Sequence, residues 1–358
     1  MTRQTARHET GLEIDRFAWW HVPGADGKAA SPPMRFGAKA SRTGAMNAVS
    51  SAAHRSPAAA LARRAPVMLE TEGWADYALL DSGHGRKLER YGRYRIVRPE
   101  EQALWTPRLP ATDWDDADAT FLGIGDDDAD GRWRYKRPLG ETWPLEYDGI
   151  RFLGRFTSFR HVGVFPEQAT HWDWLKRKIA ASRKPRPKVL NLFAYTGIAS
   201  LVAARAGADV THIDASRKAI GWARENQALA GLSDLPLRSI CEDATRFVER
   251  EIRRGSRYDG IILDPPKFGR GPKNEVWDLF PSLPGMMRAC RTLLADDADF
   301  LILTAYSIRA SFLAIDELAA ECLAGLGGIL ESGELVLREE GGGRALSTSL
   351  FSRWSRDG

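Results

Sequence analysis

Cysteines and long apolar runs are both scarce in this chain. Its 358 residues include three cysteines, Cys241, Cys290 and Cys322, which are widely spaced and odd in number. Such spacing excludes a disulfide framework and gives no zinc-ligand pattern. No apolar run approaches the ~20 residues that a membrane helix needs, and the N-terminus lacks the features of a secretory signal. We therefore expect a cytoplasmic protein without membrane contact.

Acidic residues are missing from residues 28–66, where Ala, Ser, Arg and Pro dominate. Residues 1–67 carry ten Lys or Arg and four Asp or Glu, so the rest of the chain, whose overall net charge is +4, is slightly acidic. Because few large apolar side chains are present to offset the ordering entropy, we predict a disordered basic extension, with at most a short helix near Ala58–Arg64. Three functions are open for this segment: an RNA-binding arm, an organellar targeting segment, or an extension without function that precedes a true start at Met68.

Residues 68–170 alternate short β-prone runs with turn signals and predict a small β-rich accessory domain. Its aromatic residues either fill the domain core or stack on bases, and the core is the commoner use. The aromatic candidates are Trp105, Trp133, Tyr135 and Trp143. The expected strands are 77–81, 87–91, 94–98, 132–137, 143–147, 150–154 and 162–165.

Seven Lys or Arg residues without one acid fall within residues 176–188. Such a segment is either a solvated helix end and linker or a grip for phosphates. From there a strand–helix rhythm runs to the C-terminus, so residues 171–358 predict an α/β domain with a mostly parallel seven-stranded sheet and an antiparallel C-terminal hairpin. The expected strands are 189–193, 209–214, 237–241, 258–263, 300–304, 334–339 and 347–354; the expected helices are 198–206, 217–230, 244–254, 283–294 and 311–326.

Polar residues follow the first two strands of this domain, at the sheet edge where such folds bind ligands. Asn191, Thr196 and Gly197 surround the first turn, and Gly197 lets the backbone approach a ligand at the start of a helix. Asp214 ends the second strand, where an acid can accept hydrogen bonds from both ribose hydroxyls. Ser216 is the expected N-cap of the next helix, although Asp214 itself is the alternative cap.

Another acid, Asp243, follows the third strand and directly precedes Ala244. A carboxylate there can accept a hydrogen bond from the exocyclic amine of an adenine. No pyrophosphate-binding loop accompanies these residues, which argues against most nicotinamide and flavin cofactors. The pattern therefore predicts an adenosine-containing cofactor.

The sequence Asp-Pro-Pro-Lys-Phe at 264–268 follows the fourth strand and is the sharpest signal in the chain. Pro265 and Pro266 fix φ and lack N–H groups, so we expect their backbone carbonyls to be rigid acceptors that point outward. Asp264 adds a carboxylate, and Phe268 offers a face on which a planar group can stack. These residues together predict a flat acceptor that bears an amine.

In this order the motifs resemble those of class I S-adenosylmethionine-dependent methyltransferases, which have a Rossmann-like fold. The sequence Asn-Leu-Phe-Ala-Tyr-Thr-Gly at 191–197, together with Asp-Pro-Pro-Lys-Phe, looks more closely like the bacterial 23S ribosomal RNA base methyltransferases, over about residues 160–358 and including Gly-Val-Phe-Pro-Glu-Gln at 163–168. The resemblance implies S-adenosylmethionine as cofactor and RNA as partner. It also implies that the methionine part lies among Phe193, Tyr195 and Gly197, the ribose at Asp214, the adenine at Asp243 and the target base at 264–268.

One departure from these relatives concerns a cysteine. Relatives that methylate carbon 5 of cytosine need a thiolate to activate the ring, and they carry it after the fifth strand. Here Tyr306 takes that place, and Cys290 and Cys322 fall in expected helices. We therefore expect a ring or exocyclic nitrogen as acceptor, with positioning and desolvation giving most of the acceleration and neither a metal nor a general base required.

Three other interpretations stay open on the sequence. The same chemistry can act on a protein side-chain amide or on a small planar metabolite, because a flat amide also suits an Asp-Pro-Pro site. Carbon-5 methylation of cytosine is a second alternative, which Tyr306 disfavours. A non-catalytic RNA-binding module is a third, and the complete set of acids after successive strands argues against it.

Overall fold

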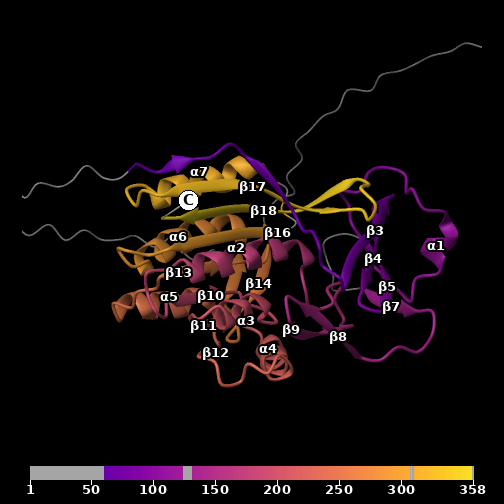
Figure 1. Cartoon of the computed structure of the whole chain (residues 1–358), viewed down its shortest axis with the longest axis horizontal. Coiled ribbons are helices and arrows are strands. Elements are labelled where there is room, and N and C mark those ends of the chain that lie inside the picture. The colour runs from indigo at the N-terminus through magenta and orange to yellow at the C-terminus, as the bar shows by residue number, and fades with distance from the viewer. Residues whose placement is uncertain (1–59, 124–130, 307, 309, 357–358) are drawn as a thin grey trace, which may run out of the picture. The chain divides into compact units, whose positions relative to one another are not determined.

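The computed structural model describes residues 60–123, 131–306, 308 and 310–356. They include a nine-stranded sheet with the order β1-β17-β18-β16-β13-β10-β11-β12, in which β2 also pairs with β17 (Figure 1). No helix of these residues is long and apolar enough to cross a membrane. The strands are β1 (Ala62–Arg63), β2 (Val67–Glu70), β10 (Lys188–Leu192), β11 (Asp209–Asp214), β12 (Leu237–Cys241), β13 (Gly260–Leu263), β16 (Phe300–Tyr306), β17 (Ile329–Arg338) and β18 (Ala345–Ser355).

The predicted parallel sheet with an antiparallel ending is confirmed. Strands β12, β11, β10, β13 and β16 pair in parallel, whereas β18 runs antiparallel to both β16 and β17. The order reverses at β10, which lies between β11 and β13. In such sheets the crevice at the switch point is where ligands bind.

Helices cover both faces of the sheet. They are α2 (Ala169–Ala180), α3 (Ile198–Arg205), α4 (Arg217–Leu229), α5 (Ala244–Arg253), α6 (Leu279–Leu293) and α7 (Phe312–Leu323). Val189 of β10 packs in the same apolar cluster as Leu201 of α3, and its neighbour Leu190 packs in a second cluster with Met287 of α6. Because successive strand residues point to opposite faces, a strand buried on both sides reads as a continuous apolar run.

The accessory segment forms a five-stranded sheet and a separate hairpin. Strands β3, β4 and β5 make an antiparallel meander, and β6 joins β5 in parallel after the short helix α1. Both β6 and α1 were absent from the sequence prediction. The elements are β3 (Tyr77–Gly83), β4 (Arg86–Tyr91), β5 (Tyr94–Pro99), α1 (Ala111–Asp115), β6 (Ala119–Leu122) and β7 (Arg132–Tyr135), with the hairpin β8 (Thr142–Tyr147) and β9 (Ile150–Arg155).

The strand predicted at 162–165 is wrong, because these residues form an irregular segment before the 3-10 helix η2 (Pro166–Gln168). Val162 and Val164 do bury their side chains, which produced the strand-like pattern. Gly163 between them has φ +98° and lies so close to Trp222 that a Cβ would meet the indole ring at 2.2 Å. The backbone therefore turns where a strand would continue.

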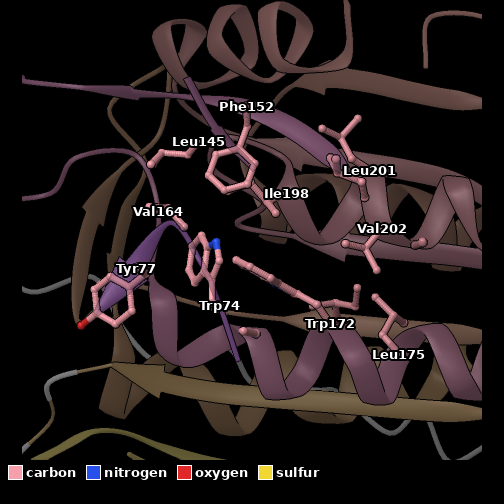
Figure 2. Packing of buried hydrophobic residues seen from close by; sticks show 14 of the residues in the cluster. Trp74, Tyr77, Leu145, Phe152, Val164, Trp172, Leu175, Ile198, Leu201 and Val202 are labelled. Atoms are coloured by element: carbon pink, nitrogen blue, oxygen red, sulfur yellow. The ribbon is translucent and has the colours of Figure 1, made fainter. Parts of the chain in front are cut away.

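One apolar cluster joins the accessory elements to the helices on one face of the large sheet (Figure 2). Trp74, between β2 and β3, packs edge-on against Trp172 of α2, with 6.0 Å between the ring centroids, and lies 6.1 Å from Phe152 of β9. Trp143 is also buried in this cluster, so for this residue the core interpretation is confirmed. Large aromatic side chains bury much apolar surface and dominate the energetics of such a core.

Residues 60–67 differ from the prediction of an unstructured segment, which ended at residue 67. Ala62–Arg63 form β1 where a short helix or disorder was expected, β2 (Val67–Glu70) begins at the predicted boundary, and both strands are parallel to β17. Arg63 also pairs with Glu317 of α7 at 2.9 Å. Strand pairing satisfies backbone groups that an open edge at β17 would leave unpaired. These hydrogen bonds join residues far apart in sequence, so the local composition could not predict them. Residues 1–59 lie outside the described part, and the domain divisions at 67/68 and 170/171 stay predictions.

Part of the basic segment 176–188 is paired with acidic residues of the chain. Lys176 lies 2.9 Å from Asp148, and Arg186 lies 3.6 Å from Asp209. Lys184 lies 2.8 Å from Asp297. Three of the seven cations therefore already have acidic partners, which favours a structural use of this segment over a phosphate grip.

Candidate active site

A cavity of about 650 Å³ opens at the carboxyl ends of β10, β11, β13 and β16. This is the edge where the sequence predicted a ligand site, and ten of the thirteen predicted residues line it. They are Phe193, Tyr195, Asp214, Ser216, Asp243, Ala244, Asp264, Pro265, Pro266 and Phe268. The volume falls within the range of about 300–1,000 Å³ that is typical of small-molecule and cofactor sites.

Three predicted residues do not line the cavity. Asn191 is 2% exposed and donates from Nδ2 to Ser200 Oγ at 2.9 Å, and Thr196 Oγ1 donates to the Gly163 carbonyl at 2.7 Å. Gly197 is the N-cap of α3 with φ +85°, and a Cβ there would lie 3.0 Å from the Cβ of Ala223. The left-handed backbone and the close packing of α4 both require glycine at this position, and its predicted role in the approach of a ligand stays a prediction.

The loop after β10 has an uncommon backbone. Phe193 has φ +57° and Tyr195 has φ +50°, a region that non-glycine residues rarely adopt and that is often found at functional sites. The Ala194 N–H donates to the Ile213 carbonyl at 3.0 Å, which fastens the loop to the end of β11. Both aromatic side chains reach the cavity, and Phe193 packs against Trp277 with 4.7 Å between the ring centroids.

Asp214 joins this loop to α4. Its Oδ2 accepts from the Tyr195 N–H and its Oδ1 from the Ser216 N–H, both at 2.8 Å. Burial raises the pKa of Asp214, while the two backbone hydrogen bonds act in the opposite direction. Ser216 caps α4 by accepting from the Ala219 N–H, so this predicted N-cap is confirmed. A carboxylate has about four acceptor positions, so Asp214 retains capacity for hydroxyl donors.

Asp243 has a structural use besides the predicted one. It caps α5, and its Oδ1 accepts from the Arg246 N–H at 3.0 Å. Its side chain is mostly buried yet lines the cavity. The cap occupies one oxygen, so the carboxylate can still accept a hydrogen bond from an amine in the cavity.

Asp264 lies directly after β13, beside the side-chain amide of Gln168, the last residue of η2. Gln168 Nε2 donates to Asp264 Oδ2 at 3.2 Å. Burial, reinforced by the negative charge of Glu167, raises the pKa of the Asp264 carboxyl to about 7. A carboxyl with such a pKa can exchange a proton near neutral pH.

The Pro266 carbonyl differs from the sequence prediction, which expected a free acceptor that points outward. It accepts a hydrogen bond from the Trp277 indole N–H at 2.7 Å and is therefore occupied within the protein. The following Phe268 is largely exposed and begins an unpredicted hairpin of β14 (Phe268–Arg270) and β15 (Val276–Asp278). Trp277, which belongs to β15 of this hairpin, thus supports the motif through this hydrogen bond.

Several lining residues were not predicted as site residues. His161, Phe165 and Tyr306 form an aromatic wall, with ring centroids 5.7 Å apart between His161 and Tyr306 and 5.2 Å apart between Phe165 and Tyr306. Phe165 and Gln168 lie in the Gly-Val-Phe-Pro-Glu-Gln segment, which was a usable signal. His161 and Trp277 had none, because they lie in a loop and in an unpredicted hairpin.

Comparison with known proteins adds the following similarities. Residues 86–317 match the family model described as S-adenosylmethionine-dependent methyltransferase. The crystal structure of an S-adenosylmethionine-dependent methyltransferase from Agrobacterium tumefaciens is 60% identical and covers 83% of this chain and 96% of that one, with a TM-score of 0.80. A putative methyltransferase from Streptococcus mutans, 16% identical, shares the fold over 79% of this chain and 76% of its own, with a TM-score of 0.59.

Curated relatives are similar over a shorter stretch. The ribosomal RNA large subunit methyltransferase K/L of Shewanella frigidimarina is 33% identical over 155 residues, which are 43% of this chain and 21% of that protein. The protein of the same name from Allochromatium vinosum is 37% identical over 38% of this chain and 18% of its own length. The chain thus spans about a fifth of the length of the curated relatives it matches.

Proposed function

This chain belongs to the S-adenosylmethionine-dependent methyltransferase family, and from that premise we propose that it methylates a nitrogen of a base in RNA, with 23S ribosomal RNA as the substrate. The enzyme is an S-adenosylmethionine-dependent methyltransferase with a Rossmann-like fold, and S-adenosylmethionine is its cofactor. One observation carries the proposal: Asp264 and the following motif line the same cavity as Asp214 and Asp243. A cofactor and a planar acceptor can therefore meet there.

The proposed cofactor contacts follow the polar groups along the cavity. Asp214 accepts hydrogen bonds from the ribose, and Asp243 accepts one from the adenine amine. Phe193 and Tyr195 surround the methionine part, while Ser216 and Ala244 complete the wall. Asn191, Thr196 and Gly197 support this site by holding the loop and α4, which their internal contacts favour over direct binding.

The proposed acceptor contacts use the motif after β13. Asp264 accepts a hydrogen bond from the N–H of the base, Pro265 and Pro266 form a rigid wall, and the exposed ring of Phe268 stacks on the base. S-adenosylmethionine supplies an electrophilic methyl group, which the nitrogen lone pair takes up as the C–S bond breaks. The proton that leaves the nitrogen passes to the Asp264 carboxylate. Holding the base nitrogen in line with the C–S bond of the methyl donor supplies most of the acceleration.

Nitrogen is favoured over carbon 5 of cytosine because no thiol of the described residues lines this cavity. Tyr306 is the last residue of β16 and occupies the place where the carbon-5 relatives have cysteine. Cys241 turns toward the Ala215 carbonyl, to which its Sγ donates at 3.5 Å, and Cys290 and Cys322 are buried in α6 and α7. Without a thiolate, the carbon would not become nucleophilic enough to attack.

Incubation of the enzyme with radiolabelled S-adenosylmethionine and either total RNA or soluble protein tests the substrate class. We expect label in the RNA, and mass spectrometry of digested nucleosides should show an N-methylated base. Asp264→Ala should abolish transfer while cofactor affinity, measured by calorimetry, stays within about twofold. Label in protein instead, or a carbon-5-methylated cytosine, would contradict the proposal, as would undiminished turnover of the variant.

A further inference from the structure

A second cavity, of about 510 Å³, lies on the five-stranded accessory sheet. Strands β4, β5, β6 and β7, helix α1 and the segment before it contribute to its lining. Four basic side chains line it, whereas one acid, Asp115, is found among its lining residues in the described part of the chain. The basic residues are His84, Arg86, Arg134 and Lys136. The surplus of Lys and Arg over acidic residues in this lining contrasts with the slightly acidic balance of residues 68–358.

Two of these cations are available for a ligand. Lys136 is engaged by Asp116, but the exposed side chains of Arg86 and Arg134 form no hydrogen bond or ion pair with any residue that the structure describes. The Arg86 guanidinium lies 5.2 Å above the ring of Trp114. That ring is fixed, because it is buried and its Nε1 donates to Asp81 at 3.0 Å. Stacking orients a guanidinium while leaving its N–H edge free to bind a phosphate.

An aromatic face accompanies these cations. Tyr135, next to Arg134 on β7, is 45% exposed, and its ring meets Phe156 edge-on at 5.3 Å. Because side chains alternate along a strand, this ring lies on the Trp133 face of β7, opposite to Arg134, and Tyr135 borders the cavity at the edge of the sheet. Cations for the backbone and an aromatic ring for a base, here on the two faces of one edge strand, are the groups that bind single-stranded nucleic acid.

Strand β7 connects this cavity to the active site. The Trp133 indole N–H donates to the Phe159 carbonyl at 3.1 Å, and Trp133 packs on Phe156 at 4.9 Å. Phe159 is exposed and lines the active-site cavity. Residues 133–135 of a single strand thus contact the rim of one cavity and line the other.

We propose that the accessory cavity and the adjoining edge strand β7 bind an unpaired segment of the same RNA strand that carries the target base, with Arg86 and Arg134 holding phosphate in the cavity and Tyr135 stacking on a base that passes over the edge of β7. This rests on the proposed RNA activity and narrows it: the substrate is a single-stranded RNA segment rather than a free nucleoside or metabolite. The flanking base must be unpaired, since a paired base has no free face to stack. The site adds affinity for RNA and leaves cofactor binding untouched.

The test compares Arg86→Glu/Arg134→Glu and Tyr135→Ala with a matched control. Arg238→Glu/Arg257→Glu changes the charge equally in another cavity, at the amino ends of β11 and β12, where both arginines are also exposed. Each protein is assayed for binding of a 23S ribosomal RNA fragment across a salt series, for kcat/KM on that RNA, and for cofactor affinity. Unchanged cofactor affinity shows that a variant is folded.

We expect the Arg86/Arg134 variant to bind RNA at least 10-fold more weakly, with the slope of log K against log salt reduced by about 1.4 for two lost phosphate contacts. Tyr135→Ala should lose about 5- to 100-fold. A short oligonucleotide that carries the target base alone should erase the difference between variant and wild type. The control double variant should bind RNA like the wild type.

Two failures can be told apart. If the wild type methylates RNA but the Arg86/Arg134 and Tyr135 variants bind and methylate it normally, the accessory site is refuted and the proposed function stands. A loss that the Arg238/Arg257 control reproduces also refutes the site, because it then reflects net charge. If the wild type methylates no RNA, the proposed function fails and the accessory site fails with it.

Discussion

The amide of Gln168 donates from Nε2 to Oδ2 of Asp264 across 3.2 Å, joining the last residue of η2 to the end of β13. This hydrogen bond fixes one oxygen of the carboxylate and leaves the other for the acceptor. A residue that acts in this way is a positioning residue, since its effect passes through Asp264.

Replacing Gln168 by Leu should lower kcat about 10- to 100-fold, the range expected for loss of a hydrogen bond to a charged group. Cofactor affinity should stay near that of the wild type, because Gln168 lies on the acceptor side. Gln102→Leu removes a comparable amide that donates to the Ser347 carbonyl at 3.0 Å, and it serves as control. Single-turnover kinetics and calorimetry measure the two quantities. Equal losses in both variants would contradict the assigned position.

The pH dependence of kcat/KM should report the raised pKa of Asp264, about 7. The ionised carboxylate accepts the proton, so activity should rise about tenfold per pH unit below pH 7 and level off above it. Glu167→Gln removes a negative charge that raises this pKa, and the profile should shift to lower pH. Glu225→Gln, an exposed substitution far along α4, should leave the profile in place. A Glu167→Gln profile that stays in place or moves to higher pH would contradict the electrostatic argument.

Asp214→Ala should weaken cofactor binding at least 10-fold by calorimetry. The change removes two proposed bonds to ribose hydroxyls and also releases the Tyr195 and Ser216 N–H groups, which lie 2.8 Å from the carboxylate. Asp234→Ala, an exposed position between α4 and β12, is the control and should bind normally. If the Asp214 variant bound the cofactor with wild-type affinity, the proposed ribose contact of Asp214 would be contradicted.

Trp74→Ala should lower the free energy of unfolding by about 3–5 kcal/mol, since it empties a buried site between α2 and β9. Leu104, which is 87% exposed, offers a matched test of lost apolar surface without a cavity. Leu104→Ala should change stability by less than about 0.5 kcal/mol. Urea unfolding followed by circular dichroism measures both. A small effect of Trp74→Ala would mean that the cluster in Figure 2 relaxes around the loss.

The sequence by itself determined seven of the nine strands of the large sheet and the residues at the ends of its parallel strands. Val189 and Leu190 show why: a strand covered by helices on both faces must be apolar at every position, and this leaves a continuous run. The turn chemistry around Asp214 and Asp264 is equally local, because caps and prolines act on their own neighbours.

Only the tertiary structure decided which distant residues complete the two cavities. Trp277 reaches the Pro266 carbonyl from an unpredicted hairpin, and β1 and β2 add to β17 from more than 250 residues away in sequence. Arg86 of β4 and Arg134 of β7 line one cavity on an accessory sheet whose strand order could not be read from alternation alone. The local sequence pattern indicates whether a residue is buried but not which residue it packs against. That choice depends on contacts between distant segments, which form only when the chain has folded.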